Sequence, residues 1–195
     1  MRGPVAGGAR LGALALALLA PSGCAADLGL GGGAEAAKGH AVGLGRFAAS
    51  TRVGSPLNDH GLLLGASVEN RIEHAEGSRF TGGIMVGGGF GPGAIGGSPI
   101  GFEGYGEAGT PLRSTLFRDG SFYAGGGLNV PIRLDETRHI SELNDSTWVL
   151  MRRFELVPTL RARLHVDHPG AESAYLRYDV GALLSLRMRV FNDFF

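Results

Sequence analysis

The residues best suited to chemistry lie close together between His165 and Ser173. This stretch also contains Asp167, His168 and Glu172. Such groups could begin a metal site, or could supply a general acid, a general base and a nucleophile. However, no third metal ligand stands at a diagnostic spacing, and a Pro-Gly pair marks a turn within the stretch. The sequence therefore predicts a polar hairpin loop here, with no catalytic residue and no metal site.

A second possible site is the run from Gly91 to Gly96, which reads G-x-G-x-x-G. A dinucleotide site would need a helix whose N-terminus faces the phosphates, but Gly97-Ser98-Pro99 and another strand-like run follow. Chance matches are expected in a chain with 35 glycines. We therefore predict no nucleotide cofactor, and no other motif calls for a cofactor.

Paired carboxylates are the third possibility. Glu103 and Glu107 share one face of a predicted strand, but four residues of strand separate them by about 13 Å. This distance is too long for the acid pair of a glycosidase. With 18 basic and 18 acidic residues, the chain also has no electrostatic reason to bind nucleic acid.

The elements that carry these residues alternate like strands. From Leu176 to Val190 every second residue is apolar, and the intervening positions include Asp179 and Arg187. This period of two places apolar side chains on one face of a strand and charges on the other. A helix would mix the two kinds of residue on one stripe and would place Gly181 in its middle.

The same alternation recurs along the chain. It is clear in residues 62–72, 80–90, 100–108, 122–134 and 154–166, and weaker in 39–50. Polar or Gly- and Pro-rich segments separate these runs at 51–58, 91–99, 109–121, 135–147 and 168–173. This pattern predicts an all-β fold, a single antiparallel up-and-down β-barrel of eight strands over residues 39–195. Seven strands are clear. The eighth comes either from the Gly- and Ala-rich segment 24–38, which is otherwise a tether, or from splitting 147–167.

Residues 1–23 have the features of a signal peptide: Arg2 and Arg10 precede a short apolar run. The sequence Pro21-Ser22-Gly23-Cys24 resembles a bacterial lipobox, although Pro21 stands where Leu is preferred. This resemblance implies that Cys24 is lipidated; the alternative is cleavage after Ala26, which discards Cys24. Cys24 is the only cysteine, so no intramolecular disulfide can form.

Two arrangements explain the alternating faces. A membrane barrel would turn its apolar face to lipid and its polar face inward, whereas a soluble barrel would do the reverse. The apolar faces carry no charge and the polar faces are nearly charge-balanced, as buried charges must be. We therefore expect an ion-pair network inside the barrel, formed by Glu69, Glu103, Glu107, Arg133, Glu155, Arg161, Arg163, Asp179 and Arg187. Pro158, on the apolar face, requires a local irregularity in the ladder.

Two short motifs allow a family resemblance to be stated. The segment 179–186, DVGALLSL, resembles the terminal β-signal of outer-membrane barrels, and 123–128, YAGGGL, resembles a Gly-rich strand of small OmpA- and Opacity-type barrels. Phe195 ends the chain, as is usual in that family, although Asn192 and Asp193 interrupt the alternation before it. The resemblance implies an eight-stranded barrel in the outer membrane of a Gram-negative bacterium, and it transfers no catalytic residue.

These observations lead to one expected function and one alternative. We expect a monomeric outer-membrane barrel, in contact with membrane lipid and anchored by a lipid if Cys24 is modified. Its role would be structural or in surface display, because side chains fill an eight-stranded interior and leave no general pore. The alternative is a lipid-tethered, soluble periplasmic protein that binds an apolar ligand inside a lipocalin-like barrel. A lipid-modifying barrel enzyme is a further alternative, but no motif supports it.

Overall fold

The described part of the chain consists of β-strands joined by turns and loops. The computed structural model describes residues 24–37, 40–55, 60–73, 77–112, 121–143, 146–167 and 175–194. The strands are β1 (Cys24–Ala37), β2 (His40–Ser55), β3 (His60–Glu73), β4 (Gly77–Phe90), β5 (Phe102–Pro111), β6 (Phe122–Asn129), β7 (Ile132–Leu143), β8 (Ser146–Asp167) and β9 (Tyr175–Phe194). Within these ranges, no helix is long and apolar enough to cross a membrane.

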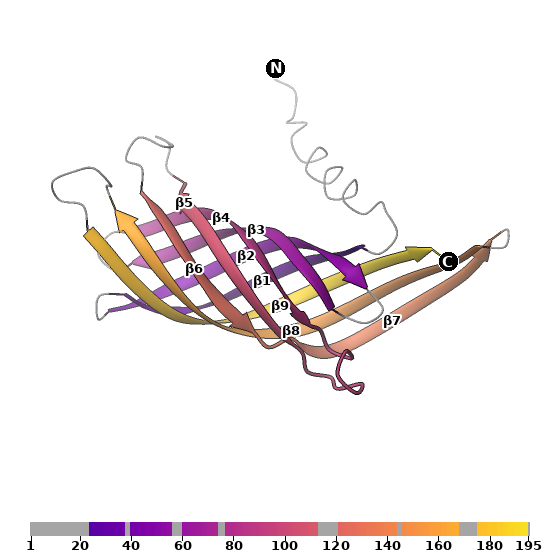
Figure 1. The fold of residues 1–195 in the computed structure, drawn as a ribbon. Helices are drawn as coiled ribbons and strands as arrows, with labels where there is room; N and C mark the ends of the chain where they lie inside the picture. The colour runs from indigo at the N-terminus through magenta and orange to yellow at the C-terminus, as the bar shows by residue number, and fades with distance from the viewer. Residues whose placement is uncertain are drawn as a thin grey trace, which may run out of the picture.

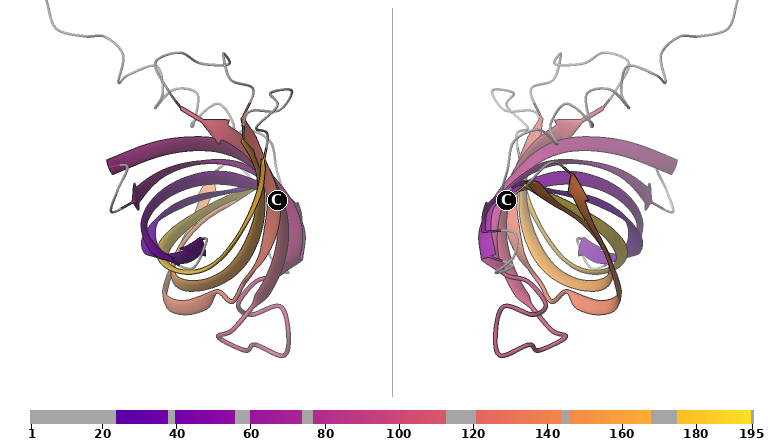
Figure 2. Two further views of the ribbon diagram at one scale, coloured as in Figure 1. Left: turned by 90° about the vertical axis from the view of Figure 1, so that its left-hand side faces the viewer. Right: turned by 90° about the vertical axis from the view of Figure 1, so that its right-hand side faces the viewer.

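The strands close into an antiparallel barrel. Each strand from β1 to β5 pairs with the next, β8 pairs with β9, and β9 pairs with β1. The pairing of β6 with β8 completes the ring, which has eight strands (Figure 2). This result confirms the predicted all-β, up-and-down, eight-stranded barrel. The extra strand, β7, follows β6 along β8 and extends with it beyond the other strands (Figure 1).

Two prolines lie where β8 changes its partner. Residues 159–166 of β8 pair with β6, and residues 146–156 pair with β7. Pro131 lies between β6 and β7, and the Val130 amide donates a hydrogen bond of 2.9 Å to the carbonyl of Pro158. Pro158 lies between the part of β8 that pairs with β6 and the part that pairs with β7. No ladder hydrogen bond on this side of β8 therefore requires the backbone N–H that proline lacks. A register shift between Arg133 and Asp135 then starts the projecting part of β7.

The strand boundaries differ from the expected ones in three places: β2 continues to Ser55, the run 122–134 is divided between β6 and β7, and β7 is longer than expected. Segment 135–147 was expected to be a polar connection, but β7 continues to Leu143. Its charged residues pair along the β7–β8 hairpin outside the barrel, where neither face has to be uniformly apolar. Residues 147–167 do not split, and the first strand of the barrel is β1, at the Gly- and Ala-rich segment.

The register fixes the tilt of the strands. Stepping from partner to partner around the barrel returns to β1 ten residues further on, through Ala25, Arg52, Leu63, Gly87, Tyr105, Gly127, Arg161, Gly181 and Glu35. With about 3.3 Å per residue and about 4.8 Å between strands, this stagger gives a tilt of about 40° and a backbone radius of about 8 Å. Side chains can fill an interior of this size.

Glycines on the inner wall make room for large side chains. The ring of Tyr123 reaches from β6 across Gly109 of β5 to Gly83 of β4. A Cβ atom at either glycine would collide with the tyrosine hydroxyl group. The high glycine content of these strands therefore partly reflects the space that lumen side chains require.

Candidate functional site: the lumen and outer wall

Charged side chains inside the barrel form two separate layers. The first ionic layer lies near the end that holds both termini and consists of Asp27, Arg52, Glu103, Glu155, Arg187 and Arg189. The second ionic layer lies toward the other end and consists of Glu35, Arg46, Glu69, Arg71, Glu107, Arg161, Arg163 and Asp179. All fourteen side chains are buried. Strand alternation brings them inward, since every other residue of each strand faces the lumen.

Glu69 is the centre of the second ionic layer. Its carboxylate accepts hydrogen bonds from both guanidinium groups of the neighbouring Arg161 and Arg163, the latter at 2.6 and 2.9 Å. Arg161 also donates to Glu35 at 2.7 Å, and Arg163 donates to Glu107 at 2.6 and 2.8 Å. Two arginines on one strand therefore connect carboxylates from three other strands, in the paired geometry that makes such bonds strong.

The rim of this layer is organised around Asp179. Its carboxylate lies 2.9 Å from Nη2 of Arg71, 2.9 Å from Nε2 of His165 and 3.2 Å from Nε of Arg177. Arg71 also lies 3.0 Å from Glu35, which links the rim to the centre of the layer. These contacts hold the His165 ring in place among charged side chains. None of the groups in these contacts is a nucleophile that His165 could activate.

The first ionic layer joins the first strand, β1, to the last strand, β9. Arg189 of β9 donates to Asp27 of β1 at 2.6 and 3.0 Å. Arg187 donates to Glu155 at 2.7 Å and to Glu103 at 2.7 and 3.0 Å. Because Glu103 is on β5, on the other side of the ring, these bonds cross the lumen and connect its opposite walls.

Each layer is electrically balanced. The first contains three arginines and three carboxylates, and the second contains four of each. Arg153, which is also buried and lies 3.8 Å from Glu155, is paired with Glu136 of the projecting hairpin at 2.6 Å. A buried charge is tolerated only when it is paired and hydrogen-bonded, and removing one partner typically costs about 3–5 kcal/mol. The balance within each layer therefore permits both layers to be excluded from water.

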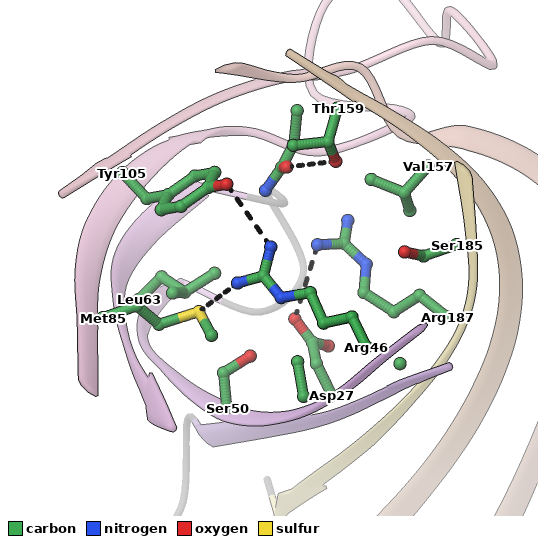
Figure 3. Close-up of a pocket in the computed structure, with 13 residues that line it drawn as sticks. Asp27, Arg46, Ser50, Leu63, Met85, Tyr105, Val157, Thr159, Ser185 and Arg187 are labelled. Atoms are coloured by element: carbon green, nitrogen blue, oxygen red, sulfur yellow. Dashed lines mark hydrogen bonds and ion pairs between the residues drawn. The ribbon is translucent and has the colours of Figure 1, made fainter. Parts of the chain in front are cut away.

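A small cavity separates the two layers (Figure 3). It has a volume of about 60 Å³, and Arg46 and Arg187 approach it from opposite layers. Met85, Leu63 and Val157 line it together with the polar groups of Ser50, Tyr105, Asn129, Thr159 and Ser185. A space of this size and polarity suits a few water molecules. It is well below the roughly 300–1,000 Å³ of a typical small-molecule site.

Most of the residues expected inside the barrel belong to these layers. Glu69, Glu107, Arg161, Arg163 and Asp179 lie in the second layer, and Glu103, Glu155 and Arg187 lie in the first. Arg133 does not join them. Its side chain is 30% exposed and lies 3.5 Å from Glu136 on the projecting hairpin. Arg133 is on β7, which lies outside the ring of eight paired strands.

The expected network also left out Arg71 and Arg189. Sequence reasoning missed Asp27, Glu35, Arg46 and Arg52 altogether. These residues lie in β1 and β2, where glycine and alanine weaken the apolar alternation. Their spacing in the sequence could have indicated them, because the positions of Asp27 and Glu35 differ by an even number, as do those of Arg46 and Arg52. Each pair therefore faces the same side of its strand.

The residues first singled out for chemistry are not brought together as a site. His165 faces the lumen beside Asp179, and Asp167 is the last residue of β8. His168, Glu172 and Ser173 lie outside the described residues, as do the expected signal peptide and Phe195. Cys24 is the first residue of β1. Among the residues that the structure does describe, no cluster of His, Cys, Asp and Glu could hold a metal ion.

The outer wall has the opposite character. Its exposed side chains are apolar, and they include Leu30, Leu62, Ile84, Leu160 and Leu184. At a tilt of about 40°, each residue advances about 2.5 Å along the barrel axis, so the register gives the height of every outward side chain. Outward side chains on different strands can therefore be compared by their height along the barrel axis.

Six aromatic side chains form two rings on this wall, and a seventh, Phe47, lies about midway between them. Phe80, Phe122 and Tyr178 lie within about 3 Å of one level, and Phe90, Phe102 and Phe154 within about 4 Å of another. The two levels are about 25 Å apart. The outward positions of the barrel strands between them carry no charged residue.

No protein-family model matches the sequence, and no curated protein matches it.

Proposed function

We propose that this protein is an outer-membrane β-barrel with a structural or surface-display role, not a general pore. The observation that carries the proposal is the uncharged apolar wall bounded by two aromatic rings about 25 Å apart. Membrane barrels have an apolar band of about this height with aromatic girdles at both interfaces. A water-soluble barrel would have no reason to expose so continuous an apolar surface.

The interior supports the second half of the proposal. Two cross-linked ionic layers block the lumen, and the space between them holds only about 60 Å³. Ions or solutes could not pass without breaking several buried pairs. The same filling argues against the lipocalin-like alternative, because an apolar ligand would find neither space nor an apolar lining.

The position of Cys24 suits a lipid anchor. Cys24 begins β1 and pairs with Val53 and Asn192 at the end of the barrel that holds the termini. The register places it about 5 Å beyond the nearer aromatic ring. In the proposed arrangement this is the level of the lipid headgroups, from which diacylglycerol on Cys24 would reach the adjacent leaflet.

Extraction distinguishes the membrane barrel from a tethered soluble one. The protein is produced in a Gram-negative host with a signal peptide that is cut before Ala25, which removes the lipid anchor. The membrane proposal expects the protein to remain in outer-membrane pellets after washing with alkaline carbonate. The chain with Cys24 serves as the matched control. Release of the anchor-free protein in folded, monomeric form would contradict the proposal and favour the lipocalin-like alternative.

A further inference from the structure

Small residues of the inner wall keep the cavity between the two ionic layers open. Gly29, Ala48, Ser50 and Ser185 contribute small side chains or none to its lining. A Cβ atom at Gly29 would meet only two carbonyl oxygens, at 3.9 and 4.0 Å, so a larger side chain would fit there. The packing of the barrel therefore does not require a glycine at this position, and the missing side chain adds to the volume of about 60 Å³.

Arg46 of β2 extends from the second ionic layer into this cavity, and its side chain is only 8% exposed (Figure 3). Its Nη1 atom donates a hydrogen bond of 3.3 Å to the hydroxyl group of Tyr105, and its Nη2 atom lies 4.0 Å from the sulfur of Met85, a weak acceptor. Among the described residues, no group accepts a hydrogen bond from its Nε atom. The guanidinium group is therefore buried with most of its five N–H groups unsatisfied.

The carboxylates nearest to Arg46 are bonded to other arginines. Glu69 lies 3.4 Å from its Nε atom and Glu107 lies 3.7 Å from its Nη2 atom, both too far or too poorly aligned for a hydrogen bond. Glu69 accepts hydrogen bonds from Arg161 and Arg163 instead, and Glu107 accepts them from Arg163. The charge of Arg46 is therefore only partly compensated by the protein, which favours an anionic partner at this buried position.

The charges around the cavity leave room for one more anion. The four arginines and four carboxylates of the second ionic layer are joined at the rim by Arg177, which lies 3.2 Å from Asp179. Among the side chains that the structure describes there, five arginines thus share four carboxylates. Asp27 is the only carboxylate in the described lining of the cavity, and it is bonded to Arg189 at 2.6 and 3.0 Å. One monovalent anion in the cavity would therefore balance the charge of the second layer.

The other polar groups of the lining are mainly donors. The amide oxygen of Asn129 accepts a hydrogen bond of 2.7 Å from Thr159, which leaves the amide N–H groups of Asn129 to donate. The Tyr105 hydroxyl group accepts from Arg46 and can donate its own proton, as can the two serine hydroxyl groups of the lining. A donor-rich lining around a guanidinium group matches the hydrogen-bonding needs of an anion.

We propose that this cavity binds one small inorganic anion, of the size of chloride or bromide, through Arg46. A volume of about 60 Å³ accommodates a monoatomic anion together with water, and it is far below the space that organic ligands occupy. Water alone would leave the buried guanidinium group without a full counter-charge, which is costly in an interior of low dielectric constant. The site lies inside the barrel, so the inference does not depend on what surrounds the outer wall.

The test compares folding stability in sodium chloride with that in sodium gluconate at equal ionic strength, because gluconate is too large for the cavity. The mature chain from Cys24 is titrated reversibly with urea in vesicles of neutral phosphatidylcholine, or in lipid-free buffer if it folds there. An anion that binds only the folded state with a dissociation constant of about 10 mM raises the folding equilibrium constant about tenfold at about 100 mM. We expect this increase in chloride for the unmodified chain and its loss in Arg46→Gln. The matched control is Arg152→Gln, which removes an exposed arginine outside the cavity and should keep the increase.

A second variant and a direct measurement complete the test. Asn129→Asp is nearly isosteric and places a carboxylate in the cavity, so it should no longer respond to chloride. Crystals of the unmodified chain grown in bromide should show an anomalous-scattering peak beside the Arg46 guanidinium group. Equal stability of the unmodified chain in the two salts would assign the cavity to water alone and overturn the inference, as would a chloride response that Arg46→Gln retains. If neither cavity variant folds, the absence of a bromide peak beside Arg46 overturns it.

Discussion

Leu160→Arg is the most direct test of the membrane-facing wall. Leu160 faces outward from β8 and is 65% exposed. The register places it within about 1 Å of the midpoint between the two aromatic rings. Its Cα partners are Leu128 and Ala182, so a new arginine would have no counter-charge beside it.

The expected cost follows from this depth. Arginine on the lipid face costs about 2–4 kcal/mol at the membrane midplane and about 0–1 kcal/mol near the interfaces. Leu160→Arg should therefore lower the equilibrium constant for folding into vesicles roughly 30- to 700-fold. Leu176→Arg is the control, because Leu176 is 60% exposed but lies beyond Tyr178, outside the apolar band.

Reversible urea titration in lipid vesicles, followed by tryptophan fluorescence, measures both variants. On a water-exposed wall, both substitutions would change stability by less than about 0.5 kcal/mol. Equal and small effects of the two substitutions would therefore refute the depth argument, as would cooperative folding of the unmodified chain in lipid-free buffer.

Three further predictions concern the lumen and the projecting hairpin. Glu69→Gln should destabilise the folded barrel by about 3–5 kcal/mol in the same titration, because the two arginines that bind this carboxylate lose a buried partner; an effect below about 1 kcal/mol would show that the layer is hydrated. Gly109→Ala should cost about 1–3 kcal/mol by overpacking against Tyr123, whereas Gly45→Ala should be nearly neutral. Burial alone would raise the pKa of Glu136, but the hydrogen bonds that Arg138 and Arg153 donate lower it overall. The stability that this carboxylate contributes is thus present above its ordinary pKa and lost as the pH falls through its lowered value. The protection factors of the β7 amides, which correct for the slower intrinsic exchange in acid, should therefore fall on acidification, and Glu136→Gln should remove this dependence.

The fold was largely predictable because strand alternation is a local property. The apolar face of β9 is uninterrupted from Leu176 to Val190, and that of β3 is broken only by Asn70 between Leu62 and Ile72, so the period of two is visible in the sequence. β1 was ambiguous because glycine and alanine give little hydrophobic contrast. The β7–β8 hairpin could not be predicted, because it projects beyond the barrel and needs no apolar face.

The candidate site was less predictable, because ion pairing depends on the register. Glu69 and Arg163 are 94 residues apart in the sequence, yet their side chains share two hydrogen bonds. Alternation predicts that both face inward, but only the ten-residue stagger of the barrel brings them to similar heights. The same is true of the two aromatic rings, whose members come from five different strands.

The seam between β1 and β9 makes the completion of this barrel a single late event. Asp27 and Arg189, bonded across that seam, lie 162 residues apart in the chain. Such distant pairing forms slowly, because the entropy lost in closing a long loop is offset only after the contacts between the two strands have formed. Until β9 is available, β1 presents a bare edge that could join another chain. The nascent protein therefore depends on being kept apart from its neighbours until its last strand arrives.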